Sequence, residues 1–168
     1  GTNILYAPTF TANRVKLAEY HLEKNMSSMI HDLVAISKEA AASTPGHPVY
    51  VAGDITMTGE QLRPMGKMEL EDLIAIYKEQ ILCLVDAGAD LLVVEPMMSL
   101  AETRAALIAA KEVCDLPVIA TLTFEADGRT LFGTDAKTAA VVLESLGASA
   151  IGANCSTGPA QMEGIISD

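Results

Sequence analysis

The sequence predicts an α/β protein whose parallel sheet is covered by helices, and three observations support this fold class. Five short runs are apolar throughout and do not alternate with polar residues, which indicates strands buried on both faces. Segments with apolar residues at helical spacing separate these runs. Hydrophobic residues make up 50% of the chain but aromatic residues only 4%, so aliphatic side chains must fill the interior.

Strands and helices are expected to alternate along the chain. The predicted strands cover residues 3–7, 49–53, 90–95, 117–124 and 148–154. After the first strand, apolar side chains from Val15 to Ile36 recur largely at spacings of three and four, which predicts a helix over 14–42. The later helices are expected over 67–87, 99–114, 135–146 and 161–167.

Residues with cap and turn preferences mark the ends of these elements. The expected caps are Ser99 and Asp135 at helix N-termini, and Gly88 and Gly147 just beyond C-termini. The breaker-rich segment 43–48, "STPGHP", predicts a turn between a helix and a strand. Residues 55–67 form a longer irregular loop directly after a strand, and loops of that length tend to be functional or mobile.

Composition limits the classes of function. No shift in composition marks a linker, so residues 1–168 are expected to form one domain. The net charge of −11 and the absence of a basic stripe argue against a nucleic-acid partner. No apolar run reaches the roughly 18 residues of a membrane span, and no export signal opens the chain. Cys83, Cys114 and Cys155 follow no disulfide or metal spacing, which favours a cytoplasmic protein.

Two architectures accept repeated βα units, a doubly wound open sheet and a (β/α)₈ barrel. No glycine-rich phosphate-binding motif follows the first strand, which counts weakly against a nucleotide-binding open sheet. Polar residues follow every predicted strand, and the carboxyl ends of barrel strands converge on one mouth. These residues are Thr9, Asn13, Asp54, Thr56, Glu95, Thr123, Glu125, Asn154 and Cys155. Five strands cannot close an eight-stranded barrel, so the prediction is a partial TIM barrel.

Five blocks of sequence, in order, resemble the homocysteine S-methyltransferase family. They are "LYAPTFTANRVKLAEYHLE", "AGDITMTGE", "LLVVEPMMSLAETRAALIAAKE", "TLTFEADGRTLFGTD" and "IGANCSTGP". The resemblance covers essentially the whole chain and is strongest to the homocysteine-binding domain of cobalamin-dependent methionine synthases. It implies a zinc-binding (β/α)₈ barrel about twice this size. This chain would then supply strands two to six, without the first strand, the last two strands or the family's adjacent-cysteine motif.

The resemblance also implies roles for particular residues. Cys155 takes the position of one zinc ligand and is the expected catalytic residue, because zinc stabilises the thiolate form of a bound homocysteine sulfur. Glu95 takes the position that binds the amino group of homocysteine. Thr9, Asp54 and Asn154 lie at the same rim and are further substrate-binding candidates.

The residues alone leave plainer interpretations open. From spacing alone, Cys155 is better explained as a small buried hydrophobe, and Glu95 is also compatible with a helix cap or an arginine partner. Thr9 and Asp54 are at least as well explained by structural roles, and Asn154 by support of a turn.

The function implied is methyl transfer to homocysteine, which forms methionine. The donor is either methylcobalamin carried on another domain or a small sulfonium or betaine molecule, and no corrinoid-binding or folate-binding signature is present in the chain. The alternative is a catalytically inactive barrel fragment or scaffold that forms homo-oligomers through open sheet edges. An unrelated lyase or aldolase barrel is less consistent, because none of the strands ends in a lysine.

Overall fold

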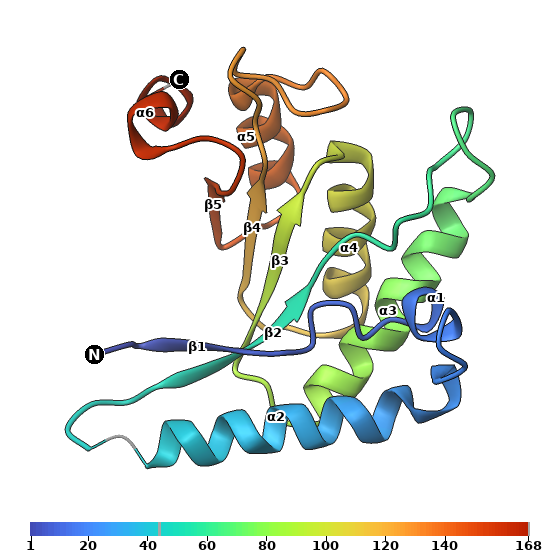
Figure 1. The fold of residues 1–168 in the computed structure, drawn as a ribbon, viewed down its shortest axis with the longest axis vertical. Helices are drawn as coiled ribbons and strands as arrows, with labels where there is room; N and C mark the ends of the chain where they lie inside the picture. Colours follow the sequence, from blue (N-terminus) through green and yellow to red (C-terminus); the bar gives the residue numbers. More distant parts are fainter. Residues whose placement is uncertain (44, 168) are drawn as a thin grey trace.

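The computed structural model describes residues 1–43 and 45–167, which form one parallel five-stranded sheet with helices (Figure 1). The strands are β1 (Ile4–Ala7), β2 (Tyr50–Ile55), β3 (Leu91–Met97), β4 (Val118–Leu122) and β5 (Ala150–Ala153). Each strand pairs with the next one in the sequence, in the order β1-β2-β3-β4-β5. A doubly wound sheet reverses its strand order at a switch point, whereas a (β/α)₈ barrel adds strands sequentially. The predicted partial barrel is therefore confirmed, as an open arc within the described part of the chain.

The helices lie on one side of this arc, and the other side is open (Figure 1). They are α1 (Arg14–Ala18), the 3₁₀ helix η1 (Glu23–Asn25), α2 (Met26–Ala42), α3 (Leu70–Asp86), α4 (Leu100–Val113), α5 (Ala136–Ser145) and α6 (Pro159–Ser167). Over the described residues, no helix is long and apolar enough to cross a membrane.

The single helix expected over 14–42 is wrong, because the chain breaks between α1 and η1. The amide of Leu22 donates to the carbonyl of Leu17 at 2.9 Å, a six-residue closure typical of a helix C-terminus. His21 takes a left-handed backbone conformation with φ of 60° inside this turn. Leu17 and Leu22 are also five positions apart, which does not fit the three- and four-residue spacing of a continuous helix.

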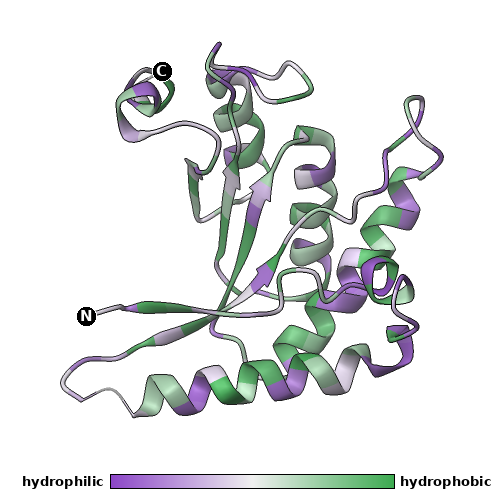
Figure 2. Ribbon diagram, in the orientation of Figure 1, coloured by the Kyte–Doolittle hydropathy of each residue, from purple (hydrophilic) through white to green (hydrophobic). Residues whose placement is uncertain are grey.

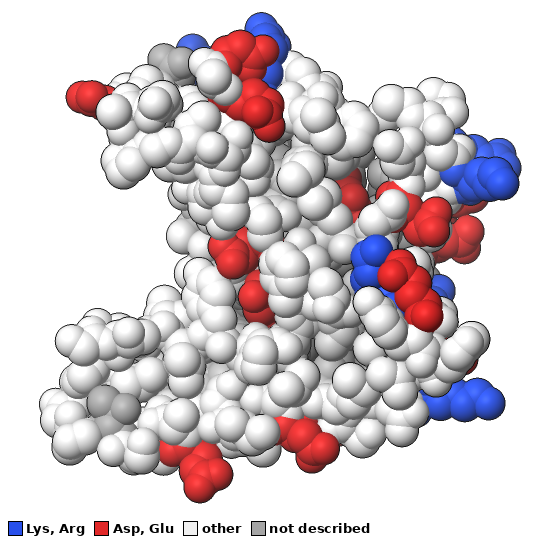
Figure 3. Space-filling model, viewed as in Figure 1, with Lys and Arg blue, Asp and Glu red and all other residues white. Residues whose placement is uncertain are grey.

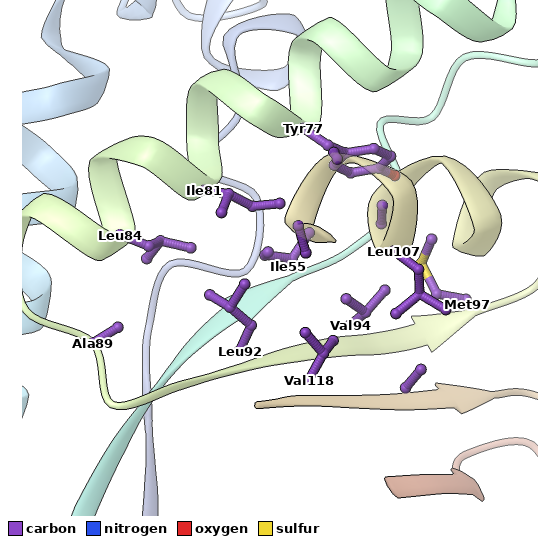
Figure 4. Close-up of a cluster of buried hydrophobic side chains, with 14 of the residues drawn as sticks. Ile55, Tyr77, Ile81, Leu84, Ala89, Leu92, Val94, Met97, Leu107 and Val118 are labelled. Carbon is purple, nitrogen blue, oxygen red and sulfur yellow. The ribbon is translucent and has the colours of Figure 1, made fainter. Parts of the chain in front are cut away.

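The main core lies between the sheet and the helices. Side chains from one face of the strands, including Ile55, Leu92 and Val94, pack against Tyr77 and Ile81 of α3 (Figure 4). Figure 2 shows that the green, hydrophobic colour follows the strands and the sheet-facing sides of the helices. Successive side chains along a strand point to opposite faces, so the residues between these core positions point to the open side of the sheet.

The opposite face of the sheet carries a smaller cluster of Ala52, Leu91 and Val93, with Ile119 packed against it. The edge strands are less covered: Ile4 and Tyr6 on β1 are exposed on this open face, whereas Ile151 on β5, level with the core residue Ala120, is exposed on the helix-facing side. Burial on both faces is thus observed for the central strands but not for the edges, where no neighbouring strand is present in the described residues.

The predicted element boundaries agree closely with the structure. The side chains of Ser99 and Asp135 accept hydrogen bonds from the third helical amides of α4 and α5, as N-caps do. Gly88 and Gly147 have positive φ angles of 89° and 85° just after α3 and α5. The turn expected over 43–48 and the domain expected over 1–168 include Thr44 and Asp168, which lie outside the described residues.

Candidate functional site

Polar residues gather at the carboxyl ends of the strands on the open face of the sheet. Asp54 and Glu95 have the same side-chain parity as Ala52 and Val93, which belong to the cluster on that face. The space-filling view shows a hollow on this side of the molecule with acidic side chains at its floor (Figure 3). The strand ends therefore bring the two carboxyl groups to one concave surface, as expected for a barrel mouth.

Asn154, directly after β5, connects this strand to Glu95 of β3 through its side chain. Its amide nitrogen donates to Glu95 Oε2 at 2.5 Å, and its carbonyl oxygen accepts from the Thr121 hydroxyl at 2.8 Å. All three side chains are partly buried. Asn154 thus holds Glu95 across β4, and Glu95 has neither the arginine partner nor the helix-capping role left open by the sequence.

The carboxyl group of Glu95 is partly removed from water, and its pKa is raised. Burial is the larger cause, and the hydrogen bond from Asn154 opposes it. No arginine or lysine forms an ion pair with Glu95 among the described residues. The other carboxyl oxygen of Glu95 has no hydrogen-bond partner among the described residues, so it can accept further hydrogen bonds from a ligand.

Asp54 is more deeply placed, with 7% of its surface exposed. Its Oδ1 atom is buried and has no hydrogen-bond partner within the described chain. Burial and, secondarily, the charge of Glu95 raise the pKa of Asp54 from 3.8 to about 7. A carboxyl group in this state can accept a cation or hold a proton near neutral pH.

Thr9 supports the backbone at Asp54. Its hydroxyl donates to the Asp54 carbonyl and accepts from the Asp54 amide, both at 2.9 Å, and the residue is fully buried. Gln80 of α3 in turn donates to the Thr9 carbonyl at 3.2 Å. Asn13, another rim residue in the sequence, is the N-cap of α1. Thr9 therefore fixes the position of Asp54, and its hydroxyl has little capacity left for a ligand.

Two residues of this face were missed by the sequence analysis, Tyr6 and Thr121. The pKa of Tyr6 is raised by burial and by the charges of Glu95 and Asp54, as expected for a hydroxyl on the same face of the sheet as both carboxyl groups. Both missed residues pair in register with residues of the open face, Tyr6 with Ala52 and Thr121 with Gly152. Side-chain parity along the predicted strands was the available signal, but it required the register between strands.

Cys155 follows Asn154 in the turn after β5 and is exposed. Cys155 and Ser156 both have left-handed backbone conformations, with φ of 63° and 57°. The Ser156 hydroxyl donates to Glu125 Oε2 at 3.4 Å, across from the loop after β4. Cys155 is therefore an exposed residue of a tight turn after β5, and is not the small buried hydrophobe of the plainer interpretation.

The donor atoms for a metal are incomplete in this part of the protein. Cys83 is on α3 and Cys114 caps the C-terminus of α4, and both pack against the main core. Among the described residues, no three His, Cys, Asp or Glu side chains are grouped so that they could hold a metal ion. Since structural and catalytic zinc sites use three or four protein ligands, these residues do not fit a complete zinc site, and Cys155 fits one ligand position only.

A buried carboxylate outside the rim anchors the long loop after β2. Glu102 of α4 accepts hydrogen bonds at Oε1 from the Thr58 amide, the Thr58 hydroxyl and the Tyr77 hydroxyl. This residue stands three positions after the cap Ser99, a common place for a glutamate on an exposed first turn, so its burial could not be predicted from the local residues.

A sequential arc of parallel strands, with polar side chains collected at the strand ends, defines an enzyme of the (β/α)₈-barrel type. The family model of the homocysteine S-methyltransferases matches residues 1–168, and the chain belongs to this family.

Similar proteins agree with this assignment. The chain is 30% identical over 169 aligned residues to methionine synthase from Mycobacterium leprae (strain TN), and equally so to methionine synthase from Mycobacterium tuberculosis (strain ATCC 25618 / H37Rv). Each match covers 96% of this chain but only 14% of the relative, so the chain spans a small part of these curated proteins.

Solved structures support the fold. The metallated form of the homocysteine methyltransferase MmuM from Escherichia coli has a TM-score of 0.78 at 20% identity and covers 92% of this chain and 58% of that chain. Its apo form has a TM-score of 0.69 at 21% identity and covers 80% of this chain and 52% of that chain.

Proposed function

We propose that this chain forms the homocysteine-binding part of a methyltransferase that makes methionine. Family membership supports the reaction class, and the site supports the substrate class. The observation that carries the proposal is the hydrogen bond from Asn154 to Glu95, because it holds a carboxylate that has no ion-pair partner among the described residues against the residue that precedes Cys155. A carboxylate can pair with the ammonium group of homocysteine, and the thiol of Cys155 can lie near the sulfur atom of the same substrate.

The proposed roles follow from these positions. Glu95 binds the ammonium group of homocysteine, and Asn154 orients Glu95. Thr9 acts by holding Asp54 in place, and Asp54 adds negative charge beside Glu95. Cys155 would supply one ligand if the intact protein holds a zinc ion, and the other ligands would have to come from outside the described residues. A zinc ion held there would supply stabilisation of a thiolate.

Binding of homocysteine to the intact protein tests this proposal. Calorimetry should show that Glu95→Gln weakens homocysteine binding at least about tenfold, since the variant loses a charge-assisted contact. Glu39→Gln, on the exposed side of α2, removes the same charge far from the rim and should leave the affinity unchanged. Equal affinity of Glu95→Gln and the unaltered protein would contradict the proposed substrate site.

The methyl donor is proposed to be methylcobalamin presented by another domain, because the sequence blocks resemble the cobalamin-dependent members of the family. Assays of the intact protein with methylcobalamin and with S-methylmethionine distinguish the two classes of donor. Activity with S-methylmethionine alone would reject the cobalamin proposal.

A second proposal, a self-associating scaffold, is favoured by the apolar side chains at the open edges. Ile4, Tyr6 and Tyr50 are between 36% and 51% exposed on the β1 side, and Ile151 is 43% exposed on β5. Unpaired strand edges and contiguous apolar surface promote association. Light scattering of the 168-residue chain tests this, and a monodisperse monomer would contradict it.

A further inference from the structure

Glu95 lies in an irregular part of β3, where the regular pairing with β4 is interrupted. The register between the two strands shifts between Val94 and Met97 of β3. The two residues of β3 inside this shift stand opposite a single residue of β4, Thr121. A bulge of this kind redirects a side chain and leaves its residues outside the regular ladder. The orientation of Glu95 therefore depends on the contacts of its side chain.

Asn154, which holds Glu95, also lies where regular structure ends. Its backbone amide still donates to the Leu122 carbonyl of β4, at 3.2 Å. The chain then leaves the sheet through Cys155 and Ser156, which both have left-handed backbone conformations. The Asn154 side chain is partly buried, and it contacts one neighbour on β3 and one on β4. These two contacts are what fix its position.

The hydrogen bonds of these side chains run in one direction. A carboxylate only accepts hydrogen bonds, so the Asn154 amide must turn its NH₂ group to Glu95, which it contacts at 2.5 Å. The carbonyl oxygen of the same amide then faces Thr121, and the Thr121 hydroxyl donates to it at 2.8 Å. Hydrogen bonds linked in this way polarise one another, so loss of the first bond weakens the second.

Thr121 is placed to begin this series of contacts. It lies on β4 between the strands of the other two residues, and it is level with Gly152 on the open face of the sheet. Its hydroxyl has no hydrogen-bond partner besides Asn154 among the described residues. The hydroxyl proton is therefore committed to Asn154, and its contribution to the site passes through that side chain.

We propose that Thr121 is a positioning residue for substrate binding. Its hydroxyl fixes the side chain of Asn154, which in turn holds the Glu95 carboxylate in the orientation that receives the substrate. The inference rests on the proposed function, in which Glu95 binds homocysteine. Thr121 itself makes no contact with the substrate.

Calorimetry of homocysteine binding to the intact protein tests the role of the hydroxyl. Thr121→Val replaces the hydroxyl by a methyl group, and valine is favoured in strands, so the fold should be retained. Loss of this hydrogen bond should raise the dissociation constant about three- to tenfold. Thr121→Ser keeps a hydroxyl and should bind within about twofold of the unaltered protein. Thr103→Val, which removes a buried hydroxyl bonded to the Ser99 carbonyl on α4, is the matched control and should leave the affinity unchanged.

A double-mutant cycle distinguishes positioning from direct contact with the substrate. In the Asn154→Ala variant, Thr121 has lost the group through which it acts. Adding Thr121→Val to that variant should therefore change the affinity by less than about twofold. Full additivity of the two losses would overturn the inference, because Thr121 would then act independently of Asn154. An unchanged affinity of Thr121→Val alone would overturn it as well.

Glu95→Gln separates failure of this inference from failure of the proposed function. Unchanged homocysteine affinity in Glu95→Gln would reject the substrate site and the inference with it. Weak binding by Glu95→Gln together with normal binding by Thr121→Val would reject only the role of Thr121. A crystal structure of Thr121→Val without substrate gives a readout that does not depend on activity. It should show the Asn154 nitrogen outside hydrogen-bond distance of the Glu95 carboxylate, and an unchanged contact would refute the proposal.

Discussion

Truncation of Glu102 to alanine should destabilise the protein strongly, although this residue lies outside the proposed substrate site. Glu102 is 6% exposed, and its Oε1 atom accepts hydrogen bonds from the Thr58 amide at 2.8 Å, the Thr58 hydroxyl at 3.0 Å and the Tyr77 hydroxyl at 2.9 Å. These contacts join the loop after β2 to helices α3 and α4. The Tyr77 hydroxyl retains a second acceptor, the Thr56 carbonyl at 3.2 Å.

The magnitude follows from the groups that lose their partner. A hydrogen bond to a charged group contributes about 1.5–3 kcal/mol, and a buried donor left without a partner costs about 1–3 kcal/mol. The Thr58 amide would lose its acceptor, whereas the Thr58 hydroxyl can rotate and the Tyr77 hydroxyl has its second acceptor. We therefore expect Glu102→Ala to lower the free energy of unfolding by about 3–4 kcal/mol. Glu102→Gln keeps one acceptor oxygen and should cost less than half as much.

Urea unfolding followed by circular dichroism measures this difference. A double-mutant cycle of Glu102→Ala with Tyr77→Phe should give a coupling free energy of about 1 kcal/mol or more, because the two side chains share a hydrogen bond. A cost below about 1 kcal/mol for Glu102→Ala, or strict additivity of the two substitutions, would refute the reasoning.

Three more predictions concern the sheet and its rim. The folded-state pKa of Asp54, about 7, exceeds the ordinary 3.8, so stability should fall as pH rises from about 4 to 7. The full shift corresponds to about 4 kcal/mol, and solvent access from the open face reduces this to about 2 kcal/mol, which Asp54→Asn should recover in urea unfolding at pH 8; an unchanged slope of stability with pH would contradict it. Cys155→Ser, at an exposed turn, should leave the melting temperature within about 2 °C but abolish methyl transfer by the intact protein; retained activity in a donor assay would reject the role of this thiol. Gly53→Ala would place its Cβ atom 2.9 Å from two methyl carbons of Leu84 and should cost about 1–3 kcal/mol in thermal unfolding; a neutral result would mean that Leu84 can move aside.

The sequence was sufficient to predict the strands, most helices and the barrel class. Buried strands can be predicted from short apolar runs, and helix ends from local residues such as Ser99 and Gly147. These properties are local, and a single sequence therefore contains them. Repeated βα units also fit a doubly wound sheet, so the barrel class depended in addition on the polar strand ends and on the family resemblance.

What could not be predicted depends on distant partners. The break between α1 and η1 depends on the left-handed backbone conformation of His21, and no residue near it in the sequence predicts that conformation. The contacts of Asn154 with Glu95 and Thr121 span 59 and 33 residues of sequence, and they arise only once the strand register is set. The roles of Cys155 and Glu95 in chemistry came from family resemblance and stay predictions.

The strand register has a consequence for the shape of a bound molecule. Asp54 is level with Val93, so Glu95 lies one same-face position further along β3, and Asn154 lies one beyond Gly152, the partner of Thr121. The polar groups therefore lie progressively closer to the carboxyl ends of the strands from β2 to β5. A small molecule bound through both its cationic and its sulfur end must lie diagonally across the strands, and its length determines which two polar groups it can contact.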